Sequence, residues 1–225
     1  MSRGHKAERR AAMIVIGMLN SKGGVGKTTL TAACAVQAAT TNAVCVVDLD
    51  SQGSYSDWYA RRGSPDNPAL LTGEDRASEA VEAVGLTSPY EYVFLDGPPG
   101  SLIVTEDAVR SSTLVVIPVR ASGLDLMASQ DCISLCQEAG TPCLVVINGK
   151  TQHDGKLVEQ ARQVLAAWKV PVAETVIAHR VQYVNAIATG KTGPEKDRKA
   201  AEEIEALWRE IKAAARKAAK ARASA

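Results

Sequence analysis

The residues with the clearest chemical potential form a glycine-rich stretch near the start of the chain. The stretch reads KGGVGKTT from Lys22 to Thr29, and it lies between an apolar run at 13–19 and a helix-like run at 30–39. Glycines let the backbone curl so that successive N–H groups face an anion, and the start of the following helix adds partial positive charge. The order strand, glycine loop, helix therefore predicts a phosphate-binding loop, where a ligand-free glycine turn is the alternative.

The members of this loop have distinct expected roles toward a nucleotide. Lys27 is expected to reach the β- and γ-phosphates, and the hydroxyl of Thr28 is expected to bind Mg²⁺. The predicted nucleotide-binding residues of the loop are Lys22, Gly23, Gly24, Val25, Gly26, Lys27, Thr28 and Thr29.

Aspartates end the next two predicted strands. Asp48 and Asp50 follow the apolar run 43–47, and Asp96 follows the run 92–95. Ligands bind at the carboxyl ends of strands in open α/β sheets, so these carboxylates are expected beside the phosphate loop. Asp96 is predicted to hold Mg²⁺ through water. A solvated turn at Asp48 and Asp50, and a helix cap at Asp96, are the structural alternatives.

The loop departs from the general G-x-x-x-x-G-K-[ST] pattern in an informative way. Ser21 stands where the first glycine belongs, and Lys22 adds a lysine at the head of the loop. In these residues the chain resembles the deviant Walker A P-loop ATPases of the ParA/MinD family, whose signature K-G-G-x-G-K-T is met from Lys22 to Thr28. The resemblance extends over nearly the whole chain from Met13 onward.

The resemblance implies roles that spacing alone does not give. In the family the first lysine crosses a dimer interface to the partner's nucleotide, which assigns Lys22 a catalytic role beside Lys27. The second aspartate of D-x-D-P-Q orients the attacking water, which implies Asp50, with Asp48 in a supporting role near the metal; Ser51 replaces the usual proline. A polar residue at a later strand end recognises adenine, which implies Asn148, although an Asn-Gly turn is an equal alternative.

The resemblance also implies an activity and partners. It predicts slow, Mg²⁺-dependent hydrolysis of ATP to ADP, an ATP-dependent homodimer, non-specific DNA binding, and a ParB-like or cargo-adaptor protein that triggers hydrolysis. The expected output is partition or positioning of plasmid or chromosomal cargo, with a cytoplasmic, nucleoid-associated location. The size of the chain is closest to that of small plasmid-type ParA proteins.

Because the formal net charge of the 225 residues is only +1, any DNA-binding surface requires basic side chains that cluster locally. Basic residues gather after the last predicted strand, and non-specific affinity rests on neutralising phosphates. The hypothetical DNA contacts are Arg180, Lys191, Lys196, Arg198 and Lys199. The basic end of the predicted tail helix 194–225 is as well explained by the favourable effect of cations at a helix C-terminus. Its last turns carry only alanines as apolar residues, which argues against membrane binding.

Apolar runs and helix-like segments alternate along the chain and predict the fold. Strands are expected at 43–47, 92–95, 113–119, 142–147 and 171–177, and helices at 54–62, 75–84, 124–138, 156–168 and 194–225. Such alternation predicts an α/β fold with a doubly wound, mostly parallel sheet flanked by helices. A single P-loop domain is expected over 13–225. Residues 1–12 are expected as a disordered basic arm, a segment from an upstream start, or a cloning remnant.

Several other function classes remain open or are disfavoured. The alternatives are a positioning ATPase for a carboxysome or chemoreceptor cluster, a nucleotide-gated binder with negligible turnover, and a P-loop kinase or ligase such as dethiobiotin synthetase. An iron–sulfur protein of the nitrogenase type is disfavoured because 96–109 contains no cysteine. The five cysteines, without a secretion signal, are expected to be reduced and buried rather than metal-binding.

Overall fold

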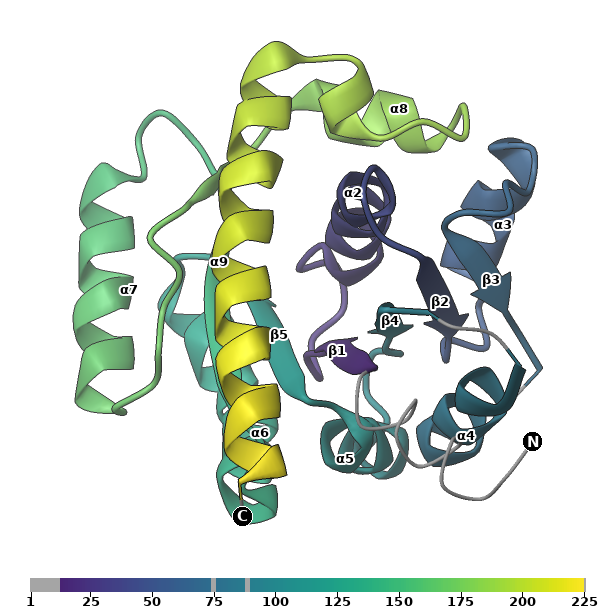
Figure 1. Cartoon of the computed structure of the whole chain (residues 1–225). Helices are drawn as coiled ribbons and strands as arrows, with labels where there is room; N and C mark the ends of the chain where they lie inside the picture. The colour runs from purple at the N-terminus through teal and green to yellow at the C-terminus, as the bar shows by residue number, and fades with distance from the viewer. Residues whose placement is uncertain (1–12, 74–75, 88–89, 225) are drawn as a thin grey trace.

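A sheet of seven parallel strands forms the centre of the protein (Figure 1). The computed structural model describes residues 13–73, 76–87 and 90–224, so the expected arm at 1–12 lies outside the described residues. The strands are ordered β3-β2-β4-β1-β5-β6-β7, and each pairing between neighbours is parallel. The predicted doubly wound, parallel α/β sheet is confirmed.

The strands are short, and the central ones are apolar except for Asp48 and Asp96, which end two of them. They are β1 (Ile14–Met18), β2 (Val44–Asp48), β3 (Ala69–Leu71), β4 (Tyr92–Asp96), β5 (Leu114–Val119), β6 (Cys143–Lys150) and β7 (Ile177–Ala178). Every residue of β1, β2, β4 and β5 is buried. Strands covered by helices on both faces need this continuous apolar pattern, and these runs show it.

Two layers of helices cover the sheet, each on its own hydrophobic core. Alternate residues of β1 face opposite sides, so Ile14, Ile16 and Met18 belong to one core and Val15 to the other. The first core also holds α2 (Lys27–Ala39), α3 (Ser54–Arg61), α8 (Val181–Ile187) and α9 (Arg198–Ala223). The second holds α4 (Ala77–Thr87), α5 (Leu102–Ser111), α6 (Gly123–Ala139) and α7 (Gly155–Ala167).

The structure differs from the expected elements in two short strands and in the tail helix, and it adds α5 and α8, which were not expected. β3 lies at the sheet edge in a segment where no strand was expected, and pairs with β2 through only three residues. The strand expected at 171–177 is reduced to β7, with Val172 making an isolated bridge to Val145. Pro171 has no N–H to donate to a ladder, which agrees with this loss. The tail helix begins at Arg198, after a 3₁₀ turn at Gly193–Glu195.

The order of the strands places β1 between β4 and β5, which the chain reaches later. At the carboxyl ends of β1 and β4, the chain therefore leaves in opposite directions along the sheet, from β1 toward β2 and from β4 toward β5. A crevice at such a topological switch point is the usual ligand site of open α/β sheets. The glycine loop, which joins β1 to α2, lies at this edge.

Candidate functional site

The glycine loop presents backbone amides with no partner of their own. Gly24 and Gly26 adopt left-handed conformations, with φ of +72° and +95°. A Cβ on Gly26 would collide with the side-chain amide of Asn148, so only glycine fits there. Among the described residues, no acceptor is paired with the backbone N–H groups of residues 23–26. Unpaired amides beside the first turn of α2 form a ready anion site.

Lys27, the first residue of α2, holds the loop closed on itself. Its side chain is buried, and its ammonium donates a hydrogen bond of 2.9 Å to the carbonyl of Lys22. Burial lowers the pKa of Lys27, and the nearby carboxylates of Asp96 and Asp50 oppose that shift. A partly desolvated ammonium inside the curl of the loop is placed to bind phosphate oxygens strongly, since little water screens it.

Asp96, at the end of β4, is a fully buried carboxyl with one oxygen left without a partner. Its Oδ1 lies 2.7 Å from the hydroxyl of Thr31, which donates to it. Its Oδ2 has no hydrogen-bond partner among the described residues. Burial raises the pKa of Asp96 to about 7, against the lowering effect of the nearby hydroxyls of Thr31 and Thr28. Such an orphaned buried oxygen needs a cation, a proton or water.

The donor set around Asp96 fits magnesium bound together with a nucleotide. Thr28, in the first turn of α2, contributes a hydroxyl beside this carboxyl. Within the described residues, no three His, Cys, Asp or Glu side chains gather closely enough to hold a metal unaided. Magnesium is usually bound through one or two protein oxygens, with phosphates and waters completing the octahedron. The sparse oxygen donors here suit that mode.

Asp48 and Asp50 differ in how their carboxylates are used. Asp48 is buried: its Oδ1 accepts from the N–H of Asp50 at 3.2 Å, and its Oδ2 accepts from the N–H and hydroxyl of Ser56 at 2.9 and 2.6 Å. Asp48 thus caps α3 and fixes the turn that carries Asp50. Asp50 is half-buried, accepts from the N–H of Gln52 at 3.0 Å, and acts electrostatically on Lys27. The supporting metal role of Asp48 stays a prediction.

Lys22 forms an ion pair with a residue that the sequence analysis missed. Its ammonium lies 2.5 Å from Oδ1 of Asp125, in the first turn of α6. The Ser122 hydroxyl contacts the same side chain and also accepts from the Asp125 N–H at 3.2 Å. Burial acts to raise the pKa of Asp125, but hydrogen bonds from Lys22 and Ser122 and the charge of Lys22 hold it below its ordinary value. The sequence feature that could have identified Asp125 is the S-x-x-D pattern from Ser122 to Asp125, which follows a predicted strand and is typical of a helix start.

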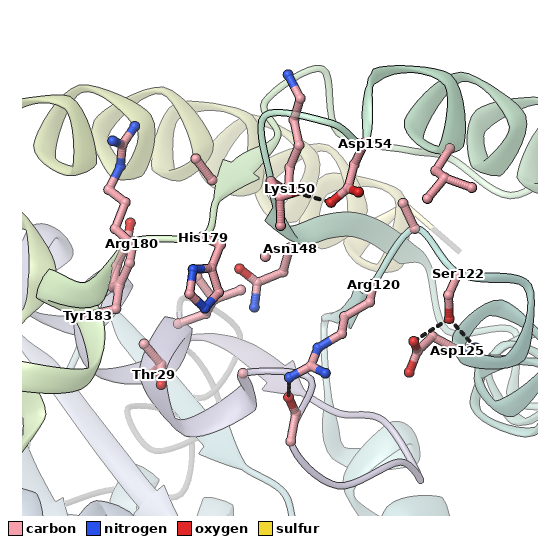
Figure 2. A pocket seen from close by; sticks show the side chains of 18 of the residues that line it. Thr29, Arg120, Ser122, Asp125, Asn148, Lys150, Asp154, His179, Arg180 and Tyr183 are labelled. Carbon is pink, nitrogen blue, oxygen red and sulfur yellow. Dashed lines mark hydrogen bonds between the residues drawn. The ribbon is translucent and has the colours of Figure 1, made fainter.

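A cavity of about 560 Å³ opens from the loop toward α8, and Figure 2 shows its lining. Asn148, at the end of β6, donates from Nδ2 to the carbonyl of Val25 at 2.7 Å. His179 and Tyr183 line the far side, and the hydroxyl of Tyr183 is buried without a hydrogen-bond partner among the described residues. The volume suits a small organic ligand such as a nucleoside. Because its amide nitrogen is engaged by the loop, an adenine contact of Asn148 stays a prediction.

The predicted DNA residues lie along the segment from β7 to α9, and the first of them, Arg180, lines the same cavity as the phosphate loop. Arg180 is half-buried in an ion pair of 2.5 Å with Glu203, so its charge is largely neutralised within the protein. Arg198 is exposed and lies 3.4 Å from Glu202. Lys191, Lys196 and Lys199 are exposed. The structure thus gathers these cations on one segment, and their contact with DNA stays a prediction.

Within the part of the chain that the structure describes, the cysteines form no group that could hold a metal ion. Cys34, Cys45, Cys132 and Cys136 are buried free thiols, as expected, whereas Cys143 is only half-buried. Burial raises the pKa of Cys34 and Cys45 to about 12, which keeps these thiols protonated. None of the helices within the described residues combines the length and hydropathy that a membrane span requires.

Comparison with known proteins agrees with this geometry. A family model described as "CobQ/CobB/MinD/ParA nucleotide binding domain" matches residues 16–193. Maintenance of carboxysome distribution protein A of Gloeobacter kilaueensis is 30% identical over 87% of this chain and 95% of its own. Chromosome-partitioning ATPase Soj of Thermus thermophilus is 29% identical over 81% and 88%.

Solved structures show the same fold at lower identity. The MinC:MinD cell division protein complex of Aquifex aeolicus contains a chain that superimposes with a TM-score of 0.71 at 19% identity, over 88% of this chain and 95% of that one. The glycine loop of the present chain, with Lys22 and Lys27, falls within the segment that the family model matches. The chain therefore belongs to the CobQ/CobB/MinD/ParA family of nucleotide-binding domains.

Proposed function

We propose that this chain is an ATP-dependent positioning ATPase whose ATP-bound form is a face-to-face homodimer. The observation that carries the proposal is the placement of Lys22 at the head of a phosphate loop whose own lysine, Lys27, is already turned inward. The side chain of Lys22 is 38% exposed, so a second subunit can approach it. A loop with one buried and one accessible lysine suits a nucleotide shared across a dimer.

The expected reaction is hydrolysis of ATP to ADP and phosphate. Lys27 and the free loop amides stabilise charge on the transferring phosphoryl group, and Asp50 positions the attacking water. Thr28 and Asp96 would hold Mg²⁺, and Asp48 fixes the turn that carries Asp50. The metal, when bound, neutralises phosphate charge.

The ATP-bound dimer is proposed to bind DNA without sequence preference and to release it when a ParB-like or cargo-adaptor protein triggers hydrolysis. Lys191, Lys196 and Lys199 support this step, because they are exposed cations on one segment. Arg198 joins them if its exposed pairing with Glu202 gives way, since such pairs are weak. The expected location is the cytoplasm, on the nucleoid.

Two kinds of cargo are compatible with this cycle. The relative named for chromosome partitioning favours plasmid or chromosomal DNA, and the relative named for carboxysome distribution favours a protein organelle. Deletion of the gene separates them: unstable inheritance of DNA supports the first, and clustered organelles with stable DNA support the second.

The cycle is tested by light scattering and DNA retention with ADP and with ATP. The wild type should dimerise and retain DNA of any sequence only with ATP. Asp50→Ala should dimerise and retain DNA without release, because hydrolysis is blocked, and Lys22→Ala should stay monomeric. Asp57→Ala, an exposed aspartate on α3, is the matched control and should behave as wild type. A wild-type monomer indifferent to ATP and to DNA would overturn the proposal.

A further inference from the structure

The end of β5, the start of α6 and the connection between them contact the chain from Asn20 to Gly24, at the head of the phosphate loop. Two contacts are made by the loop's own side chains: Asn20 Nδ2 donates to the carbonyl of Pro118 at 2.8 Å, and the Ser21 hydroxyl donates to the carbonyl of Ala128 at 2.8 Å. The latter bond uses the serine that replaces the first glycine of the general motif. The loop is therefore docked on a second structural unit, beyond its own strand and helix.

The other two contacts come from charged side chains of that unit. Asp125 pairs with the ammonium of Lys22 at 2.5 Å. Arg120, the first residue after β5, donates from its guanidinium to the carbonyl of Gly24 at 2.8 Å, a bond drawn as a dashed line in Figure 2. Arg120 is exposed, whereas Asn20 is 1% exposed. The bond to Gly24 is thus the contact that substitution can remove with little disturbance of the core.

The orientation of a peptide group explains what this bond does. In a trans peptide the C=O and the following N–H point in opposite directions. A Gly24 carbonyl held toward Arg120 therefore turns the N–H of Val25 to the opposite side. Asn148 acts in the same way one residue later, because it holds the carbonyl of Val25.

Gly24 has little else to fix its orientation. It lies in the left-handed region, at φ +72°, and no atom stands within 4 Å of the position that a Cβ would occupy. Glycine changes backbone conformation at low cost, so its peptide can rotate when unheld. A rotated Gly24 carbonyl would place a partial negative charge where phosphates bind and would repel them. The guanidinium of Arg120 opposes this rotation, because it attracts the carbonyl oxygen to the outer side of the loop.

We propose that Arg120 is a positioning residue of the nucleotide site: it holds the Gly24 peptide with its carbonyl outward, so that the loop amides face the phosphates before nucleotide binds. This inference rests on the nucleotide binding of the proposed function. Arg120 lines the cavity beside the loop, and the proposed action goes through the Gly24 peptide rather than through direct contact with substrate or metal. Burial acts to raise the pKa of Asp125, and the charge of Arg120 adds to the larger lowering effects of Lys22 and Ser122.

The test measures dissociation constants of full-length protein for ADP and ATP, together with KM and kcat. Arg120→Met keeps the aliphatic stem and removes the donors, and it should weaken binding of both nucleotides about 3- to 10-fold, the size expected for one charge-assisted bond. KM should rise with kcat nearly unchanged. Arg120→Lys keeps one charged donor and should recover part of the affinity. Arg110→Met, an exposed arginine paired with Glu106 on α5, is the matched control.

Three results would overturn the inference. Unchanged affinity for both nucleotides would show that the bond to Gly24 has no effect on binding. A loss for ATP alone would assign Arg120 to the γ-phosphate or the partner subunit instead. A drop in unfolding free energy of Arg120→Met well beyond that of Arg110→Met would mark a general structural role. Failure of the wild type to bind nucleotide would be a separate result, which removes the proposed function as well.

Discussion

The ammonium of Lys22 lies 2.5 Å from Oδ1 of Asp125, within a single subunit. Lys22 is also the residue that we propose to reach the nucleotide of a second subunit. One ammonium carries one charge, so the contact to Asp125 and a contact to a distant phosphate compete unless the carboxylate moves with the lysine. Because the Asp125 side chain is 10% exposed and that of Lys22 is 38% exposed, the lysine is the partner free to move.

Removal of Asp125 should therefore cost more stability than removal of Lys22. In Asp125→Ala the helix α6 loses an acid from its first turn, and Ser122 loses its partner. We expect a loss of about 1–3 kcal/mol in unfolding free energy for Asp125→Ala, and at most about 1 kcal/mol for Lys22→Ala. Urea unfolding of the nucleotide-free protein measures both.

Asp131→Ala supplies the control for this comparison. Asp131 is an exposed aspartate of the same helix, so its loss should change the unfolding free energy by no more than about 0.5 kcal/mol. If Lys22→Ala proves as costly as Asp125→Ala, the ion pair is the main contribution of both residues to stability. The additional role of Asp125 at the start of α6 is then wrong.

The raised pKa of Asp96 predicts a dependence of stability on pH. The pKa is about 7 in the folded protein, against an ordinary value of 3.8. When the pKa of a group is higher in the folded protein than in the unfolded chain, the group contributes fully to stability below its unfolded pKa. That contribution is lost as the pH rises through the pKa of the folded protein. Without metal or nucleotide, the wild type should lose about 2 kcal/mol from this group between about pH 5.5 and about pH 8. Urea unfolding with a chelator present measures the loss.

Asp96→Asn removes the titration and should flatten this part of the pH dependence. The comparison uses the slope of the unfolding free energy against pH rather than its absolute value. The buried amide that replaces the Asp96 carboxyl has an unpaired N–H, which lowers the stability of the variant at every pH. Asp131→Asn, on the surface, should keep the wild-type slope. A wild-type slope in Asp96→Asn would show that another group causes the dependence.

Sequence patterns predicted the residues whose roles depend on local spacing. The loop that begins at Lys22 leads from its strand into α2, Asp50 follows one buried strand, and Asp96 ends another. The carboxyl ends of parallel strands lie at the same edge of a sheet, so the order of elements was enough to predict that these residues lie together there. The short strand β3 was missed because three half-buried residues at an edge carry almost no periodic signal.

Residues that act from elsewhere in the chain escaped that reasoning. Arg120 reaches Gly24 across 96 positions, and Asp125 reaches Lys22 across a comparable separation. Their partners follow from which strands are neighbours, and β5 lies beside β1 only because of the sheet order. Asp48 was recognised as part of the site, but its hydrogen bonds to Ser56 could not be read from an aspartate at a strand end.

The hydroxyl of Thr31 should control how easily Asp96 becomes charged. It lies 2.7 Å from Asp96 Oδ1 and 3.0 Å from the carbonyl of Lys27, and its single proton can serve one of them at a time. Thr31→Val keeps the shape and removes that proton, so the pKa of Asp96 should rise further. We expect ATP hydrolysis to need several-fold more Mg²⁺, with about 1–2 kcal/mol of stability lost near pH 8.

Thr31→Ser is the matched control, since it keeps the hydroxyl and loses only a methyl group. Its requirement for Mg²⁺ should stay near that of the wild type. Equal Mg²⁺ requirements in Thr31→Val and Thr31→Ser would show that packing at this buried site, rather than the hydrogen bond, governs metal use.

Two adjacent arginines at the end of α3 should differ sharply in importance. Arg62 pairs with Glu195 at 2.9 Å, donates to the carbonyl of Gly190 at 3.1 Å, and stacks over Trp58. Arg61 only faces Asp57 at 3.8 Å on the surface. Arg62→Ala should therefore cost about 1–2 kcal/mol, and Arg61→Ala less than about 0.5 kcal/mol.

The loss in Arg62→Ala should be concentrated in the turn that precedes α9, because the broken bonds end there. Hydrogen exchange of the amides at 189–196 should accelerate roughly tenfold, while amides of β1 and β4 keep their protection. This turn carries Lys191 and Lys196, so DNA retention with ATP should weaken in Arg62→Ala and not in Arg61→Ala. Unchanged exchange at 189–196 would mean that Trp58, which donates to the carbonyl of Lys191 at 3.0 Å, holds the turn without Arg62.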